Sequence, residues 1–475
     1  MHRKVGILAI DLGTTNCKAA VFDEGGRVLG IATSGYSFRT QADSLEHDET
    51  YWRRALKGCV RQALGSCGTT PSLVAITGQA SSAVCLDEKG RLVSPILSHL
   101  DRRNLGEHLW ALKEIENLGY PPSRLFATLA WMKKRRRGDF VRINHVLDVR
   151  EYVGFMLTGE RRYESAHMKP SEMERLRGLI GFDPMKFGTP HDYLTPYGYA
   201  SERASREFGL EQGAPVYVGP ADGICGALGS GVVDEGVCAD VSGSTEVIAS
   251  PVPAHSGLGL VPYLVEGMWL FYTSPPFGVA YRKLGESLLG VLDDRKYREL
   301  DVLASKVSPG CDGMLYVPLA TLQGYVSDYS GHFFGISTNH TRGHLVRAVM
   351  EGLAFELSER IREGELRGLR VRTIVASGGG AKSGLWNQIK ADVTGKRVLV
   401  PQVLETTCLG AAIIAAVASG THEDIRRAAR KMVKTSATFA PRATNHQVYL
   451  KQLERYRAFL AALNTTQEET GPSEP

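Results

Sequence analysis

The sequence predicts an α/β protein built from two halves of similar fold with a cleft between them. Segments with the length and composition of buried strands alternate along the chain with segments of helical periodicity. In addition, the order of hairpin, helix and strand with which the chain begins starts again near residue 237. We therefore expect a first domain at residues 1–235 and a second at residues 236–463. Residues 464–475 are polar and contain Pro and Gly, which predicts a disordered tail.

The composition agrees with a two-domain protein and gives no indication of a nucleic-acid or membrane partner. Of the 475 residues, 43% are hydrophobic, and a chain of this length exceeds what one core usually organises. The net charge of +5 comes from 56 basic and 51 acidic residues, so we expect neither nucleic acid nor a membrane surface as a partner. Eight cysteines without disulfide-like spacing, and no apolar stretch of membrane-spanning length, predict a cytoplasmic protein.

The first half opens with two apolar strands on either side of a turn at residues 11–15. A helix follows from Asp48, a plausible N-cap, and leads into a short buried strand at residues 72–79. Towards the end of this half, a strand at residues 213–219 runs into a helix at residues 222–230. The small residues of that helix permit close packing against a neighbour.

The second half repeats this order. A predicted hairpin at residues 237–252 contains the turn Asp240 to Thr245, which repeats in outline the turn Asp11 to Thr15 of the first half. The elements that follow are a helix at residues 342–363, a strand at 371–380, a helix at 383–395 and a buried helix at 409–420. The repeated order is what predicts a duplicated fold.

The two turns have the composition of phosphate-binding turns. Gly, Ser and Thr in a strand-to-strand turn can direct several backbone N–H groups and hydroxyls at one phosphate. The candidate phosphate-binding residues are Gly13, Thr14, Thr15, Gly243, Ser244 and Thr245. Asp11 could then hold a Mg²⁺ ion through its water shell. The alternative is that each turn only closes a hairpin.

A third glycine cluster, Ser377 to Ala381, ends a predicted strand and opens a helix. Its bare backbone would let a ribose or a planar group lie against the chain, and the helix N-terminus adds partial positive charge. The alternative is a tight strand-to-helix turn without a ligand.

Taken together, these motifs resemble the FGGY carbohydrate kinases of the actin and hexokinase superfamily. The resemblance rests on "DLGTT" (11–15), "GPADGICGALGSG" (219–231), "GHFFGISTNHTRGHLVRAVMEGLAFEL" (331–357) and "SGGGAKSGLWNQIKADVTG" (377–395). Within the third motif, Gly331-x-Phe333-x-Gly335-Ile336 and the His344 and Glu351 regions match the family's C-terminal signature. The resemblance runs from about residue 5 to about residue 440, and it implies two actin-like (ribonuclease H-like) domains with a central cleft.

The resemblance implies transfer of the ATP γ-phosphoryl group to a hydroxyl of a small sugar, ketose or polyol. Asp222 matches the aspartate of the family's Gly-x-x-Asp motif and would be the general base. From the residues alone, Asp222 could instead be a helix N-cap. Asp11 would position Mg²⁺, while Gly379, Gly380 and Asn387 would face the adenosine.

The sugar-binding candidates depart from the family pattern. Gln79 remains from the Gln-x-His motif of xylulokinases, but Ser81 stands in place of the histidine. Asp101 and Arg103 also remain, whereas His99 replaces the family's tryptophan. Asp101 and Arg103 could bind a hydroxyl-rich ligand or form a surface ion pair. Ketopentoses, aldonates, polyols and glycerol all stay open as substrates.

A catalytically inactive nucleotide- and sugar-binding regulator on the same fold is the main alternative function. Retention of both Asp11 and Asp222 argues against it, because a protein that only binds has no chemical need for a base. The family often forms dimers, so a homodimer is a further expectation.

Overall fold

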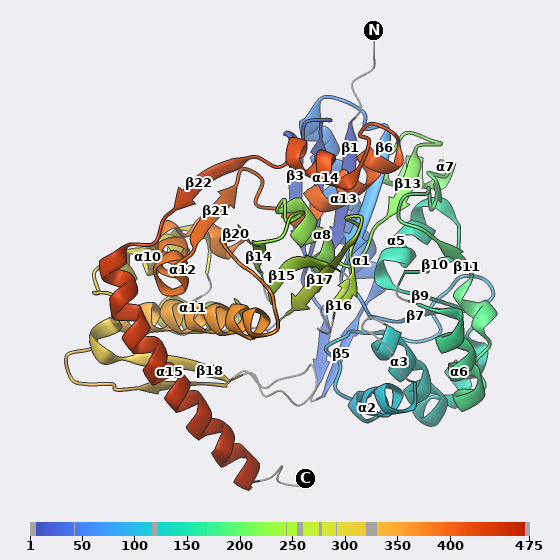
Figure 1. Cartoon of the computed structure of the whole chain (residues 1–475). Helices are drawn as coiled ribbons and strands as arrows, with labels where there is room; N and C mark the ends of the chain where they lie inside the picture. The colour runs from blue at the N-terminus through green and yellow to red at the C-terminus, as the bar shows by residue number, and fades with distance from the viewer. Residues whose placement is uncertain are drawn as a thin grey trace.

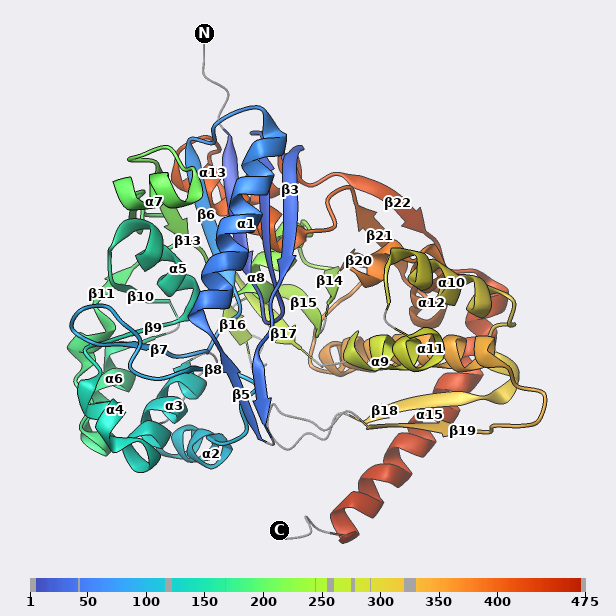
Figure 2. The ribbon, with the colours of Figure 1, turned by 180° about the vertical axis from the view of Figure 1, so that it is seen from behind.

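The chain forms two mixed β-sheets with helices between them and around their outer faces (Figures 1 and 2). This computed structural model describes residues 6–41, 43–115, 122–166, 168–243, 245–253, 260–274, 278–290, 292–319 and 330–470, without the side chains of residues 122, 279, 319, 330 and 464–470. Helices and strands alternate through both halves, which confirms the predicted α/β class.

The first sheet has six strands in the order β12-β13-β6-β1-β2-β3. Their bounds are β1 (Ile7–Leu12), β2 (Asn16–Phe22), β3 (Val28–Gly35), β6 (Leu73–Gly78), β12 (Gly198–Tyr199) and β13 (Pro215–Val218). β1 pairs antiparallel with β2 and parallel with β6, so the predicted opening hairpin is confirmed. Helix α1 (Glu49–Cys67) begins as predicted, because the Asp48 carboxylate accepts a hydrogen bond from the Thr50 N–H.

The second sheet has seven strands in the order β16-β17-β15-β14-β20-β21-β22. Their bounds are β14 (Val237–Ser242), β15 (Glu246–Pro253), β16 (Leu260–Pro262), β17 (Met268–Thr273), β20 (Thr373–Gly378), β21 (Arg397–Pro401) and β22 (Thr435–Phe439). β14 pairs antiparallel with β15 and parallel with β20. This is the pairing that β1 makes with β2 and β6, so the duplicated arrangement is confirmed.

The strand registers align the first strands of the two opening hairpins residue by residue. In each sheet, the first hairpin strand pairs with a parallel strand that ends in glycine: Leu12 lies opposite Gly78, and Ser242 lies opposite Gly378. A Cβ on either glycine would lie 2.6 Å from the carbonyl oxygen of that partner. Both positions therefore require a residue without a side chain.

Asp240 does not occupy the position of Asp11. Counted from the paired glycines, Asp11 corresponds to Val241. Because successive side chains of a strand point to opposite faces, Asp240 shares its face with Cys238, which packs towards α11 and α12, and not with Ala239, which packs towards α8. The turn repeats in outline, as predicted, but the second turn is one residue shorter, since Leu12 pairs with Cys17 and Ser242 with Glu246. Asp240 is not the counterpart of Asp11.

Two helices cross between the sheets. Helix α13 (Thr406–Ala418), from the second half of the sequence, packs on β1, β2 and β6 of the first sheet, and α8 (Asp222–Gly229) packs on β14 and β15 of the second. In Figure 1, α13 is drawn in red beside the blue strands β1 and β6. A Cβ on Gly229 would lie 1.8 Å from the Thr406 carbonyl oxygen, and one on Gly410 would lie 1.9 Å from the Cys225 carbonyl oxygen. This contact confirms the close packing predicted for α8 and the buried helix predicted at residues 409–420.

The other elements surround this centre. In the first half they are β4 (Arg39–Gln41), β5 (Ser44–His47), β7 (Val84–Leu86), β8 (Ile96–Leu97), α2 (Leu105–Glu114), α3 (Pro122–Arg135), α4 (Arg137–Arg142), β9 (His145–Leu147), α5 (Val149–Thr158), β10 (Arg162–Glu164), α6 (Pro170–Ile180), β11 (Thr189–His191) and α7 (Glu202–Phe208). In the second half they are α9 (Gly278–Leu289), α10 (Asp294–Ser305), β18 (Leu315–Leu319), β19 (Ser330–Phe334), α11 (Arg342–Leu366), α12 (Gly384–Thr394), α14 (Ile425–Met432) and α15 (Ala443–Thr470).

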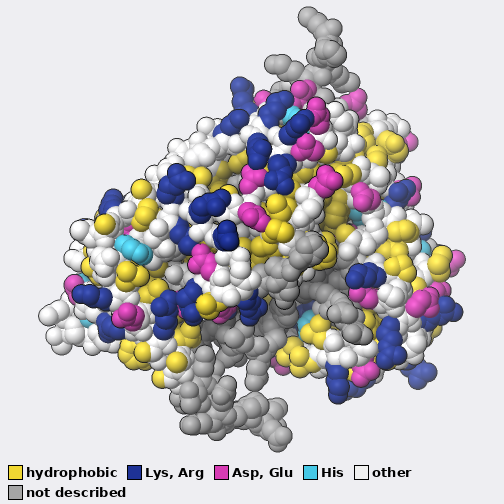
Figure 3. All heavy atoms as spheres, in the orientation of Figure 1, with side chains coloured by type: hydrophobic (Ala, Val, Ile, Leu, Met, Phe, Trp, Pro, Cys, Tyr) yellow, Lys and Arg dark blue, Asp and Glu magenta, His cyan; other side chains and the backbone are white. Residues whose placement is uncertain are grey.

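Several further expectations concern the ends, the cysteines and the surface. Helix α15 continues to Thr470, into the range of the predicted tail, and residues 471–475 lie outside the described residues. All eight cysteines are free thiols. On the face in Figure 3, acidic side chains lie among the basic ones. Within the described part of the chain, no helix combines the length and apolar character that crossing a bilayer requires.

Candidate active site

The first candidate turn connects β1 to β2. The Gly13 N–H donates to the Asn16 carbonyl oxygen over 3.0 Å, and the Tyr36 hydroxyl donates to the Gly13 carbonyl oxygen. Gly13, Thr14 and Thr15 are half-buried. The turn is thus held from within and by Tyr36, which follows β3, while its two threonines remain partly accessible.

Asp11 lies directly before this turn, with 5% of its surface exposed. Its Oδ1 atom has no hydrogen-bond partner among the described residues. Burial raises the pKa of Asp11 to about 7; Lys18 opposes this rise, whereas Asp222 and Glu405 add to it. Lys18 in turn forms an ion pair with Glu405 at 2.6 Å. Asp11 therefore presents a buried carboxyl oxygen that a cation could satisfy.

Asp222 is the first residue of α8 and is half-buried. Its Oδ1 atom accepts a hydrogen bond from the Gly223 N–H over 2.8 Å. The N-cap of α8 is Ala221, so the alternative role of Asp222 as N-cap is wrong. Burial raises the pKa of Asp222 to about 6, against the opposing effects of the Gly223 hydrogen bond and the charge of Arg150.

The backbone that leads into Asp222 is held by two side chains that the sequence analysis did not single out. The Arg150 guanidinium is 2% exposed and donates to the Gly219 carbonyl oxygen over 2.8 Å, and it also pairs with Asp148 and Glu164 at 3.1 Å each. The Thr77 hydroxyl donates to the Pro220 carbonyl oxygen over 2.8 Å. The available sequence signal was an adjacent arginine and glutamate in a helix segment that is otherwise mostly apolar, "VREYVGFML" (149–157).

The second candidate turn is also closed by the N–H of its glycine, but the accepting carbonyl lies two residues further on instead of three. The Gly243 N–H donates to the Thr245 carbonyl oxygen over 2.9 Å. Gly243 is exposed and Thr245 is half-buried. Ser244, also predicted to bind phosphate, lies outside the described residues.

The third glycine cluster lies against the second turn. Gly378 has a φ of +76°, which favours glycine, and a Cβ on Gly380 would lie 2.7 Å from the Ser242 Cβ. Asn387 is buried in α12, where its Nδ2 donates to the Ala381 carbonyl oxygen over 2.8 Å and its Oδ1 has no partner within the described chain. The fold thus brings Gly379, Gly380 and Asn387 together with the 243–245 turn.

Gln79 lies at the end of β6, where its N–H donates to the Leu12 carbonyl oxygen over 2.9 Å, next to Asp11. Its side-chain nitrogen lies 3.3 Å from the His47 Nε2, and its Oε1 has no partner among the described residues. Burial lowers the pKa of His47 to about 4, so this imidazole is neutral near pH 7. His47, on β5, is a neighbour of Gln79 that the sequence analysis missed.

Asp101 and Arg103 form an ion pair at 2.7 Å, but not a surface one, since Asp101 is fully buried. Asp101 also accepts a hydrogen bond from the Leu45 N–H over 2.9 Å. Arg103 contacts Glu46 at 2.8 Å and lies over the Trp131 ring at 5.1 Å. Asp101 is therefore committed to protein contacts that orient Arg103.

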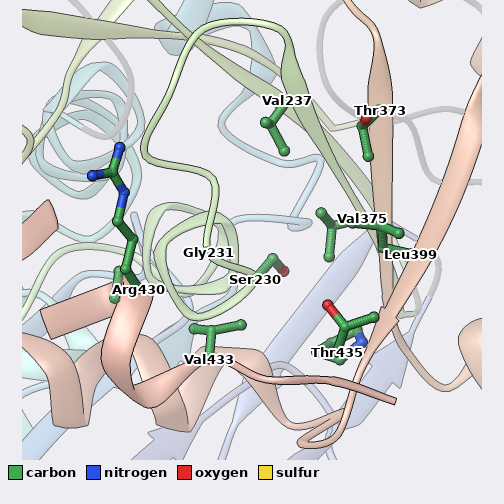
Figure 4. A pocket seen from close by; sticks show the side chains of 11 residues that line it. Ser230, Gly231, Val237, Thr373, Val375, Leu399, Arg430, Val433 and Thr435 are labelled. Carbon is green, nitrogen blue, oxygen red and sulfur yellow. The ribbon is translucent and has the colours of Figure 1, made fainter. Parts of the chain in front are cut away.

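A cavity of about 270 Å³ lies elsewhere, as Figure 4 shows. Its walls include Ser230, Val237, Thr373, Arg430 and Val433. Val237 and Thr373 begin β14 and β20, whereas the second candidate turn follows the end of β14 and the third glycine cluster lies at the end of β20. The cavity is thus at the opposite end of the sheet from the candidate active site.

Comparison with known proteins identifies the family. The model of the N-terminal domain of the FGGY family of carbohydrate kinases matches residues 6–229, and the C-terminal domain model matches residues 292–419. The chain is 24% identical over 485 residues to the L-xylulose/3-keto-L-gulonate kinase of Escherichia coli (strain K12), covering 96% of this chain and 97% of that one. It is 25% identical over 454 residues to the gluconokinase of Bacillus subtilis (strain 168), covering 87% and 88%.

Solved structures share the fold. The gluconate kinase from Lactobacillus acidophilus aligns with a TM-score of 0.85 at 17% identity, covering 99% of this chain and 100% of that one. The xylulose kinase from Rhodospirillum rubrum aligns with a TM-score of 0.80 at 24% identity, covering 97% and 99%. These likenesses confirm the two-domain actin-like fold. Because the two family models together match more than half of its residues, the chain belongs to the FGGY family of carbohydrate kinases.

Proposed function

We propose that this carbohydrate kinase transfers the γ-phosphoryl group of Mg-ATP to a hydroxyl of a small sugar, ketose or polyol, with Asp222 as the general base. The observation that carries the proposal is the half-buried Asp222 carboxylate at the start of α8, close enough to Asp11 that its charge raises the Asp11 pKa. A base is useful when its pKa is near the working pH. The pKa of Asp222, about 6, leaves it ionised at pH 7 yet able to accept a proton.

In this mechanism Asp222 accepts the proton of the substrate hydroxyl as that oxygen attacks phosphorus. The hydrogen bond from the Gly223 N–H fixes one carboxylate oxygen, which leaves the other for the substrate. Arg150 and Thr77 hold the carbonyl groups of the two residues at the start of this loop and so orient the approach to Asp222. Phosphoryl transfer depends mainly on such alignment and on charge stabilisation.

The chain's donors fit Mg²⁺ held mostly by phosphate and water. Asp11 offers a buried oxygen without a partner among the described residues, and a nearby cation would favour its ionised form, which burial disfavours. Within the described ranges, no three His, Cys, Asp or Glu side chains gather as a metal site. Mg²⁺ commonly uses one or two carboxylates together with substrate phosphates. When bound, ATP supplies the phosphoryl group, and Mg²⁺ supplies positive charge that offsets the negative charge of the phosphates.

We assign the phosphates to the two hairpin turns and the adenosine to the third glycine cluster. Residues for the phosphates are Gly13, Thr14, Thr15, Gly243, Ser244 and Thr245, and residues for the adenosine are Gly379, Gly380 and Asn387. The partial exposure of Thr14, Thr15 and Thr245 and the close approach of Gly380 to Ser242 support this assignment.

We assign Gln79 to direct hydrogen bonding with the acceptor, because its buried Oε1 has no partner in the part of the chain that the structure describes. Arg103 would contact the substrate from the site wall, oriented by Asp101. Relatives named as L-xylulose/3-keto-L-gulonate kinase, gluconokinase and autoinducer-2 kinase indicate a range of polyhydroxylated acceptors.

The test is ADP release from Mg-ATP with a panel of ketoses, aldoses, polyols and aldonates, on the wild type and on Asp222→Asn. We expect one compound to stimulate release and the variant to lose about 10²- to 10⁴-fold in kcat. Unchanged nucleotide affinity and thermal stability in the variant would assign the loss to chemistry. If the variant keeps full activity, Asp222 is not the base. If no compound stimulates release although Mg-ATP binds, the regulator alternative is favoured.

A further inference from the structure

A lysine is completely buried beneath the second hairpin turn. Lys390 of α12 has no exposed surface, and its ammonium contacts the Asp240 carboxylate, the Ser242 hydroxyl at 2.9 Å and the Glu246 carboxyl at 3.5 Å. It also lies 4.5 Å from the centre of the Trp386 ring. The Ser242 hydroxyl donates to Asp240 over 2.8 Å. We call Asp240, Ser242, Glu246 and Lys390 the sealed cluster.

The charges of the sealed cluster balance. Burial alone would lower the pKa of Lys390, but Asp240 and Glu246 outweigh it and raise that pKa, so Lys390 is charged. Burial and the charge of Asp240 raise the pKa of Glu246 well above its usual value, which favours its neutral form. With Glu246 neutral, one ammonium faces one carboxylate. Such a buried pair contributes little net stability compared with apolar packing, so its value lies in fixing geometry.

The sealed cluster lies next to the residues that we assign to the nucleotide. Ser242 is the last residue of β14 and directly precedes Gly243. On its other side, Ser242 packs against Gly378 and Gly380. Lys390 lies one helical turn after Asn387 on α12. A single ammonium therefore ties the 243–245 turn to the helix that carries Asn387 and to the third glycine cluster.

We propose that Lys390 is a positioning residue for the nucleotide, which holds the 243–245 turn in register with Gly379, Gly380 and Asn387 through Ser242 and Asp240. The inference rests on the nucleotide roles proposed above for these residues. It concerns ATP affinity alone, because the sealed cluster lies in the second sheet, whereas Asp11, Asp222 and Gln79 belong to the elements of the first half.

The main variant is Lys390→Met, which keeps much of the side-chain length and removes the ammonium. We expect the KM for ATP and the Kd for Mg-ATP, measured calorimetrically without sugar, to rise by about 10-fold or more, as for other positioning contacts. The KM for the acceptor, and kcat at saturating ATP, should stay within about twofold of wild type, since the acceptor site is untouched.

Two further variants keep the test decisive if Lys390→Met does not fold. Lys390→Met with Asp240→Asn restores charge balance but not the contact with Ser242, so its ATP affinity should remain reduced. Ser242→Ala keeps the ion pair and removes one contact, so its effect should be smaller and in the same direction.

The matched control is Arg347→Met, which removes another buried cation of the second half, paired with Glu351 at 2.7 Å. It should lower thermal stability without changing the Kd for Mg-ATP.

The outcomes separate this inference from the proposed function. Nucleotide Kd is measured without turnover, so a raised Kd in the Lys390 and Ser242 variants supports the inference even if no acceptor is phosphorylated. An unchanged Kd in both the double variant and Ser242→Ala overturns it. An equal rise in the KM values for ATP and acceptor also overturns it, because that result would show a general loss of structure.

Discussion

The two opening hairpins of this kinase each have a lysine between two carboxyl groups, but the exposure of these groups differs greatly. At the first hairpin, the side chains of Lys18 and of Glu405, which comes from the second half of the chain, are 29% and 27% exposed, and Asp11 has an oxygen without a described partner. In the second half, Lys390 and Asp240 are 0% exposed and Glu246 is 4% exposed. We call Asp11, Lys18 and Glu405 the open cluster, because its side chains are partly accessible or lack a described partner. The sealed cluster, also called the closed cluster below, is covered by its own side chains.

A shift of one residue separates the two arrangements. Asp11 lies on the face of its strand that meets α13 between the sheets, whereas Asp240 lies on the outer face, against α12. Since side chains alternate along a strand, the shift turns a carboxylate from the space between the domains into the core. With the roles proposed above, the two hairpins differ in use: the first provides a carboxylate for the metal ion, and the second uses its carboxylate to hold a turn in place.

The largest expected effect comes from Asp11→Asn. We expect kcat to fall about 10²-fold or more, because the carboxylate that positions the metal's charge is lost. Stability should stay the same or rise, because burial disfavours the ionised form of Asp11 and so raises its pKa. Initial rates over a Mg²⁺ titration, with thermal unfolding of the nucleotide-free protein, measure both effects.

The matched control is Asp240→Asn, which makes the same change in the closed cluster. It should lower the free energy of unfolding by about 1–3 kcal/mol and leave kcat within a few-fold of wild type. The loss is limited because the Glu246 carboxyl, 3.5 Å from the Lys390 ammonium, offers a second partner. A fall in kcat as large as that of Asp11→Asn would show that the two clusters do not differ in role.

A second expected effect is on the pH dependence of kcat/KM. Asp222 acts as a base only when ionised, and its pKa of about 6 is higher than usual, so kcat/KM should rise with pH through 6 and level off above it. Below pH 6 the fall should approach about tenfold per pH unit. Glu246→Gln, in the closed cluster, should leave this profile in place. A profile that is flat down to pH 5, at saturating Mg²⁺, would contradict the role of Asp222.

The smallest expected effect comes from Lys18→Met in the open cluster. Its ion pair with Glu405 is partly exposed, so the free energy of unfolding should change by less than about 1 kcal/mol, whereas Lys390→Met should cost about 3–5 kcal/mol. Urea unfolding of the two variants compares them directly. Because Lys18 lowers the pKa of Asp222, its loss should also move the acid limb of the kcat/KM profile to higher pH. Equal losses of stability in Lys18→Met and Lys390→Met would show that exposure does not determine how much these two ion pairs contribute.

Much of the fold could be predicted from local sequence patterns. The hairpins, the Asp48 cap and the close packing of the glycine-rich helix α8 follow from residue types at short spacing. The resemblance to the family is confirmed by both domain models. The 235/236 domain boundary, the tail, a homodimer and a cytoplasmic location stay predictions.

Contacts between residues far apart in sequence could not be predicted. Lys390 and Asp240 are 150 residues apart, and Arg150 and Gly219 are 69 apart, so no spacing rule relates them. The side chains of His47 and Gln79 lie 3.3 Å apart, but helix α1 separates the two residues in the sequence. The face on which Asp240 lies depends on strand register, which a turn motif alone does not determine. The match of Asp240 to Asp11 failed for this reason.

The exchange of helices between the sheets has a consequence for synthesis on the ribosome. The face of the first sheet that carries Ile7, Ala9 and Phe22 is covered by residues 408–416, which are translated long after β13. The nascent first half therefore exposes an apolar sheet face until nearly all of the chain has emerged, which makes it a natural client for chaperones. A gene cut at codon 235 would yield two fragments, each missing the helix that shields its sheet, and both would have to be made together to refold.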